Sequence, residues 1–134
     1  MGDRPMPTKL PDTVCTLMNR SVEQHGDETA VIYGAEHISY GALNQLALKA
    51  ARGLRDLGIR PGDRVALWLP NTIAYLVLYL ACARLGAIAV AVNTRYRSVE
   101  VGDIVQRSGA RVMALWPGFR NIDFLTILAE IPAD

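Results

Sequence analysis

The residues VALWLPNTIAYLVLYLACARLGAIAVAV, numbered 65–92, decide which fold class the chain adopts. The stretch opens and closes with short apolar runs, Val65–Leu69 and Ile88–Val92, of the kind found in buried parallel strands. Between these runs, helix-compatible apolar residues continue as far as Gly86, a typical helix-ending residue. The stretch therefore predicts a buried strand, a buried helix, a glycine turn and a second buried strand.

The segment 72–92 is also long enough to cross a bilayer and carries a single charge, Arg84. A charge placed beyond the middle of a membrane span costs about 2.5–3.5 kcal/mol on insertion scales. The character of the segment also changes at Gly86, from helix-compatible to strand-like. We therefore favour the globular interpretation, and a small membrane protein spanning 72–92 stays as the less favoured alternative.

Working outward, the succession of helix, glycine and apolar strand occurs three times, at Gly58, Gly86 and Gly109. Alternating helices and apolar strands predict an α/β fold, in which a parallel sheet is flanked by helices on both faces. A final helix is expected at Ile122–Ile131. The three predicted strands are Val65–Leu69, Ile88–Val92 and Val112–Trp116.

The N-terminal third predicts a helix and a hairpin ahead of the sheet. Thr13 is placed to cap a first helix that stops at Gly26. Ala30–Tyr33 and His37–Tyr40 then predict a short hairpin that turns around Gly34.

Later helices carry their own start signals. Ser39, Asn71 and Ser98 are predicted to cap the three helices that follow the hairpin. The helix after Ser39 is expected to bury one stripe of side chains, namely Leu43, Leu46, Ala47, Ala50, Leu54 and Leu57.

Composition excludes several function classes. The 134 residues are 51% hydrophobic and 20% charged, with a formal net charge of +1, so nothing steers the protein to nucleic acid. Cys15 and Cys82 stand far apart, which predicts neither a disulfide framework nor a thiolate metal site and favours a reducing compartment. His25 and His37 lack the spacing of metal ligands, so no metal site is expected.

Candidate chemistry lies at the carboxyl ends of the predicted strands, where open parallel sheets bind ligands. The turns there contain neither G-x-G-x-x-G nor G-x-x-x-x-G-K-[ST], which argues against a dinucleotide or P-loop site. Arg95 and Arg97 follow the strand 88–92 and form a small basic cluster. An arginine there can bind phosphate through its planar fork, or simply pair with Glu100 or Asp103 on the surface.

Several short phrases occur in a definite order along the chain: ISYGAL (38–43), GIRPGDRVAL (58–67), LPN (69–71), LGA (85–87) and VNTRY (92–96). This ordered set resembles the start of the AMP-forming acyl-CoA synthetases, a branch of the adenylate-forming, or AMP-binding, enzymes. The later phrase WPGFRNIDF (116–124) is similar to the branch that acts on medium-chain, cyclic or aromatic acids.

The resemblance implies a two-step ligase reaction in the complete enzyme. A carboxylate attacks the α-phosphate of ATP to give an acyl adenylate and pyrophosphate, and the CoA thiol then displaces AMP to form a thioester. ATP, Mg²⁺ and CoA are thus the implied cofactors, with none expected to bind tightly to this segment alone. The implied fold is a partial N-terminal subdomain of the adenylate-forming enzymes.

The family's catalytic motifs are missing from these 134 residues. They lack the Ser/Thr/Gly-rich phosphate loop, the Tyr-Gly-x-Thr-Glu motif, the ribose-binding aspartate and the late catalytic lysine, so we expect no catalytic residue and no activity from the segment alone. Arg95 is the one position to which the resemblance carries a role. Some acyl-CoA ligases use an arginine after the matching asparagine to hold a phosphate of CoA.

We therefore expect an extended leader at residues 1–12 and a truncated α/β subdomain at 13–134, in a cytoplasmic enzyme. The open sheet edge is expected to be covered by the remainder of that enzyme or by a second copy. A non-catalytic α/β interaction module is the alternative reading of the same features.

Overall fold

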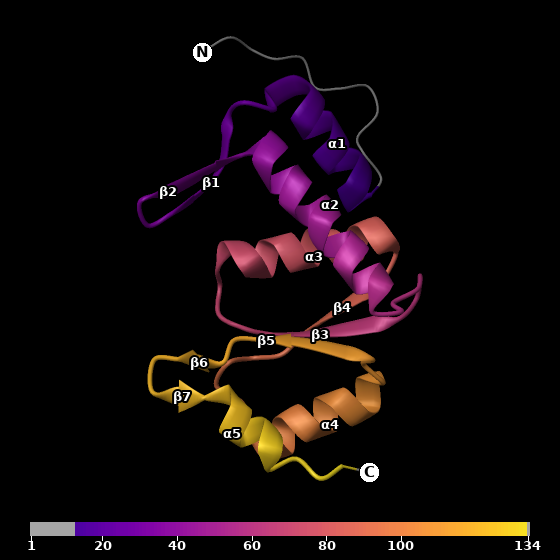
Figure 1. Ribbon diagram of the computed structural model, residues 1–134, viewed down its shortest axis with the longest axis vertical. Coiled ribbons are helices and arrows are strands. Elements are labelled where there is room, and N and C mark those ends of the chain that lie inside the picture. The colour runs from indigo at the N-terminus through magenta and orange to yellow at the C-terminus, as the bar shows by residue number, and fades with distance from the viewer. Residues whose placement is uncertain (1–12, 134) are drawn as a thin grey trace.

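The computed structural model describes residues 13–133, so the predicted leader at 1–12 lies outside the described residues. Helices and strands alternate through most of the chain (Figure 1). The elements are α1 (Val14–His25), β1 (Thr29–Tyr33), β2 (Glu36–Ser39), α2 (Tyr40–Asp56), β3 (Arg64–Trp68), α3 (Ile73–Leu85), β4 (Ile88–Ala91), α4 (Ser98–Ser108), β5 (Val112–Leu115), β6 (Gly118–Phe119), β7 (Ile122–Asp123) and α5 (Phe124–Ala129).

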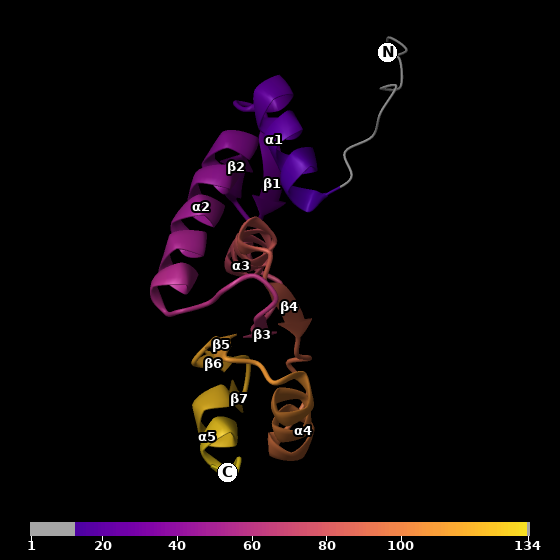
Figure 2. The same cartoon turned by 90° about the vertical axis from the view of Figure 1, so that its right-hand side faces the viewer.

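The sheet among these residues is parallel and has the order β4-β3-β5. Val65 of β3 lies opposite Ala89 of β4 on one side and Val112 of β5 on the other. Figures 1 and 2 show α2 and α3 on one side of the sheet and α4 and α5 on the other. The predicted α/β fold with helices on both faces is confirmed.

Side chains of β3 alternate between two cores, as expected for a strand covered on both faces. Val65 and Leu67 belong to one core, which packs against α2 and α3. Ala66 and Trp68 belong to the other core, which packs against α4 and α5. In that second core the Trp68 ring meets Phe124 edge-on, with 4.6 Å between ring centroids. Burying each large side chain contributes about 1.5–3 kcal/mol, so β3 stabilises both layers at once.

A third apolar cluster attaches α1 and the N-terminal hairpin to the outside of α2 and α3. It centres on Met18 of α1, Ile38 of β2 and Leu80 of α3. The hairpin β1–β2 is antiparallel, as predicted, although Tyr40 begins α2 rather than ending the strand.

Two of the four predicted N-caps are confirmed. Thr13 Oγ1 accepts a hydrogen bond from the backbone N–H of Thr16 at 3.1 Å, and Ser39 Oγ accepts from Ala42 at 3.1 Å. The extended backbone of both capping residues leaves the side-chain oxygen directed back at the first turn.

The other two caps were predicted one residue away from their true positions. Thr72, not Asn71, caps α3 by accepting from the backbone N–H of Tyr75. Arg97 occupies the cap position of α4, which makes Ser98 the first helical residue. There Glu100 supplies the capping oxygen, because its carboxylate accepts the backbone N–H of Arg97 at 3.0 Å.

Two further predictions need correction. Leu46 and Leu57 are exposed, since the buried stripe of α2 runs through Leu43, Ala47, Ala51 and Leu54 at helical spacing. The predicted helix Ile122–Ile131 is the shorter α5, because Ile122 and Asp123 pair with β6 and Asp123 then caps the helix.

Among the helices of residues 13–133, none combines the length and apolar character that crossing a bilayer requires.

Gly58, Gly86 and Gly109, which lie between a helix and a strand, have left-handed backbones, as their positions predicted, whereas Gly26 after α1 has a right-handed backbone with φ −49°. Gly86 has φ +69°, and a Cβ there would meet only Pro61 at ordinary contact distance.

We expect Gly86→Ala to lower the free energy of unfolding by about 1–2 kcal/mol, because the left-handed conformation penalises a side chain. Gly53 lies within α2 with open space around it, so Gly53→Ala should raise stability by about 0.5–1 kcal/mol. Urea unfolding of both variants measures the two changes in the free energy of unfolding. Equal changes for the two substitutions would contradict the conformational role of Gly86.

Candidate functional site

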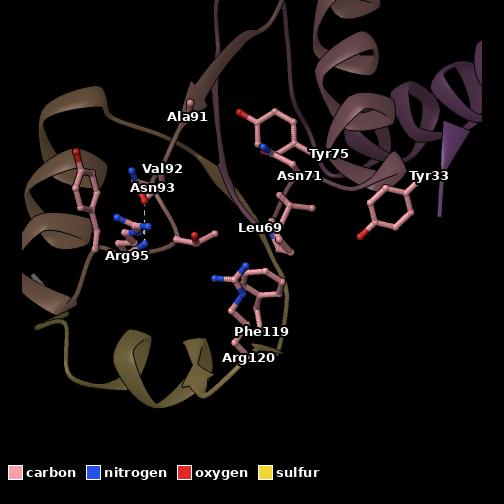
Figure 3. A pocket seen from close by; sticks show the side chains of 13 residues that line it. Tyr33, Leu69, Asn71, Tyr75, Ala91, Val92, Asn93, Arg95, Phe119 and Arg120 are labelled. Carbon is pink, nitrogen blue, oxygen red and sulfur yellow. Dashed lines mark hydrogen bonds between the residues drawn. The ribbon is translucent and has the colours of Figure 1, made fainter. Parts of the chain in front are cut away.

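A cavity of about 590 Å³ opens at the carboxyl end of the parallel sheet. This is the edge where the sequence placed its candidate chemistry. Its walls come from segments far apart in the chain: the end of β1, the turn after β3, the start of α3, the loop after β4 and the β6–β7 hairpin (Figure 3). The lining residues are Tyr33, Leu69, Pro70, Asn71, Tyr75, Ala91, Val92, Asn93, Thr94, Arg95, Tyr96, Phe119 and Arg120.

The loop after β4 is held by its own polar groups. Asn93 Oδ1 accepts the backbone N–H of Arg95 at 2.9 Å, and the backbone carbonyl of Asn93 accepts that of Tyr96 at 3.0 Å. The guanidinium of Arg97 donates to the backbone carbonyls of Arg95 and Tyr96 at 2.9 and 3.1 Å. Arg97 is therefore used to build the loop and does not line the cavity.

Arg95 behaves differently from Arg97, although both belong to the predicted basic cluster. Within residues 13–133 its guanidinium has no hydrogen bond or ion pair, and it lines the cavity. The surface pairing considered from the sequence does not form, since Glu100 accepts from Arg97 and Asp103 pairs with Arg107 at 3.3 Å. The structure thus leaves the Arg95 guanidinium available to a ligand.

Arg120 is a second cavity arginine that the sequence analysis missed. It sits in the two-residue connection of the β6–β7 hairpin with φ +56°, and no other non-glycine residue of the described chain has a positive φ. Its guanidinium lies over the Phe119 ring, with Cζ 5.1 Å from the centroid (Figure 3). The turn-forming residues around it, Gly118 and Asn121, were the available signal for a hairpin.

The cavity is positively charged. None of its lining residues is acidic, while Arg95 and Arg120 are both exposed to it. Because Thr72 caps α3, the side-chain amide of Asn71 is not needed as a cap and lines the cavity. The remaining wall is rich in tyrosine and phenylalanine. Carboxylates line two adjoining cavities instead: Glu36 lines one of about 330 Å³, and Glu100 and Asp103 line one of about 440 Å³. Such a surface suits an anion that carries a planar group.

The described residues offer no metal site and no activated nucleophile. They contain no group of three or more His, Cys, Asp or Glu side chains that could hold a metal ion. His25 pairs with Glu28 at 2.8 Å, away from the cavity. Burial raises the pKa of the Cys82 thiol, which lies on the buried face of α3 and packs in the core as an uncharged side chain.

The comparisons with known proteins agree on one family. The family described as AMP-binding enzyme matches residues 18–128. Long-chain-fatty-acid–CoA ligase FadD13 of Mycobacterium tuberculosis is 43% identical over 96 residues, which are 71% of this chain and 19% of that protein. Triostin synthetase I of Streptomyces triostinicus is 36% identical over 116 residues, covering 87% of this chain and 22% of that protein.

Solved structures agree with the sequence relatives. The crystal structure of the N-terminal domain of FACL13 from Mycobacterium tuberculosis superposes with a TM-score of 0.74 at 32% identity. The match covers 77% of this chain and 27% of that one. The chain spans about a fifth of the length of the curated relatives it matches.

Glu100 gives the site loop a pH dependence. Hydrogen bonds from the backbone N–H groups of Glu100 and Arg97 hold the pKa of the Glu100 carboxyl below its usual 4.5. A lowered pKa adds stability above pH 4.5 that is lost as the pH falls through the folded-state pKa. We expect the stability gap between the native chain and Glu100→Gln to be full above the usual carboxyl pKa of 4.5 and to close as the pH falls through the lowered pKa of Glu100. Urea unfolding across that range measures it, and a gap that stays constant would contradict this role.

Arg120 should carry a measurable conformational cost. Arg120→Gly and Arg120→Ala both remove the contact with Phe119, but only glycine relaxes the positive φ. We expect the glycine variant to be more stable than the alanine variant by about 1 kcal/mol. Thermal and urea unfolding compare the two directly, and an alanine variant at least as stable as the glycine variant would show that the turn is not strained.

Proposed function

The chain belongs to the AMP-binding enzymes, and on this premise we propose that it forms the N-terminal part of an acid–CoA ligase. The complete enzyme activates a carboxylic acid with ATP to an acyl adenylate and then transfers the acyl group to CoA. The match to a CoA ligase over 71% of the chain supports this assignment. The segment alone is inactive, because its sequence lacks the family's adenylation motifs.

The observation that carries the proposal is the acid-free cavity with an unpaired arginine at the carboxyl end of the sheet. Arg95 binds a phosphate of CoA through its guanidinium, which no carboxylate of residues 13–133 neutralises. Arg97 and Glu100 position it by fixing the loop and the start of α4. ATP and Mg²⁺ are held by other parts of the enzyme, where the phosphate-binding motifs lie.

The acid belongs to the medium-chain, cyclic or aromatic class. This assignment rests on the stretch 116–124, which forms the turn after β5, the β6–β7 hairpin and the first residue of α5. The enzyme works in the cytoplasm, consistent with free thiols at Cys15 and Cys82.

The remainder of the enzyme, or a second copy, covers the outer edge of the sheet. Ile88 of β4 is 53% exposed, and Val99 at the start of α4 is 81% exposed. Large exposed apolar side chains on an edge strand and on the helix that follows it in the chain favour the burial of this surface by a partner. If the chain instead works as an independent protein, this apolar surface would bind a partner, and the chain would be an interaction module. The tests below distinguish this alternative.

Arg95→Gln in the complete ligase tests the role of Arg95. Losing a hydrogen-bonded charge contact costs about 1.5–3 kcal/mol, so the KM for CoA should rise about 10- to 150-fold. Acid-dependent exchange of pyrophosphate into ATP, which needs no CoA, should remain unchanged. Arg107→Gln is the matched control, since Arg107 is exposed on α4 outside the cavity.

An unchanged KM for CoA in the Arg95 variant would remove the proposed phosphate contact. A panel of long-chain, medium-chain, cyclic and aromatic acids tests the acid class in the same assay. Turnover by the 134-residue chain alone would overturn its assigned inactivity, and a complete protein without acid-dependent ATP consumption would favour the interaction module.

A further inference from the structure

The cavity holds two arginines whose side chains the fold itself does not use. Six other arginine side chains of the described chain bond to or pair with acceptors of the protein, namely Arg55, Arg64, Arg84, Arg97, Arg107 and Arg111, whereas Arg20, Arg52 and Arg60 lie outside the cavity. Arg95 and Arg120 both line the cavity, and within residues 13–133 neither guanidinium has an oxygen partner. They reach it from two separate loops, the one after β4 and the β6–β7 turn (Figure 3).

We infer that Arg95 and Arg120 together bind a doubly charged phosphate monoester, so that the cavity distinguishes monoesters from singly charged diesters. This inference rests on the proposed function and adds Arg120 to it.

Charge balance supports a dianion. Two guanidiniums share one cavity whose lining contains no carboxylate, so a monoanion leaves one positive charge uncompensated. A phosphate monoester has two negative charges near neutral pH and three terminal oxygens, enough to accept from both arginine forks. The amides of Asn71 and Asn93 add neutral groups and do not alter this balance.

The backbone of Arg120 supports a ligand-binding role for its side chain. A positive φ in a two-residue hairpin connection is the position at which glycine costs least. Arginine stands there instead, and its guanidinium is held over Phe119 at the cavity wall. The strained turn therefore presents a charged side chain to the cavity at a position that structure alone would give to glycine.

CoA contains both kinds of phosphate, which makes the inference specific. Its ribose carries a 3′-phosphate monoester, and its pyrophosphate links two ester groups. A two-arginine site for the monoester predicts that the complete ligase uses CoA with a lower KM than dephospho-CoA, which lacks only the 3′-phosphate.

The deciding experiment measures the KM for CoA and for dephospho-CoA in the complete ligase and in its Arg120→Gly and Arg107→Gln variants. Glycine is chosen because it suits the positive φ of the turn. We expect Arg120→Gly to raise the KM for CoA at least tenfold, to leave that for dephospho-CoA unchanged, and the control to change neither.

Calorimetric titration of the same proteins gives a readout without turnover. Adenosine 3′,5′-bisphosphate should bind the native protein and bind at least tenfold more weakly to Arg120→Gly, while cyclic adenosine 3′,5′-monophosphate, a diester, should show no difference between the two.

Three results would overturn the inference: an unchanged KM for CoA in Arg120→Gly, an equal rise for both thiols, or equal binding of the bisphosphate. If Arg95→Gln raises the KM for CoA and Arg120→Gly does not, the proposed function stands and only the pairing fails. If the complete protein shows no CoA-dependent reaction, the proposed function fails, and the calorimetry still decides whether the two arginines bind a monoester.

Discussion

The burial of β3 on both faces is the constraint on which the rest of the chain depends. From Val65 to Trp68 every residue is fully buried, and alternate side chains belong to different cores. A strand in this position must be apolar throughout, must be paired on both sides and must be covered by helices above and below. The parallel neighbours, the four flanking helices and the glycine turns that return the chain to the sheet all satisfy that requirement.

The same constraint places the cavity. Parallel strands end at a common edge, so the turns that follow β3 and β4 meet there, and the β6–β7 hairpin closes the side beyond β5. Most polar groups near this edge are used for folding: Asn93 and Arg97 fix the loop, while Glu100 and Thr72 begin helices. What the fold leaves uncommitted is a small set of cationic and amide groups, which gives the cavity its positive charge.

The architecture could be predicted because it follows from strong local signals: apolar runs for the strands, and Gly58, Gly86 and Gly109 for the helix ends. The cap of α3 was predicted one residue early because Asn71 and Thr72 offer nearly equivalent capping oxygens, and only the backbone path selects between them. The start of α4 was predicted one residue late because its capping oxygen comes from Glu100 in the first turn and not from the residue at the cap position, Arg97. Arg95 was within reach of sequence reasoning because it follows a clear strand. Arg120 was not, because the hairpin that carries it has strands of only two residues each.

The one-residue displacement of the α3 cap has an evolutionary consequence. Thr72 starts the helix, while its neighbour Asn71 faces the cavity and makes no hydrogen bond to residues 13–133. The residue that begins the helix and the residue that lines the cavity are therefore neighbours in the sequence but are not the same residue. A descendant of this protein can exchange Asn71 to suit another ligand and still keep the signal that begins α3, so selection can diversify the cavity without first having to rescue the fold.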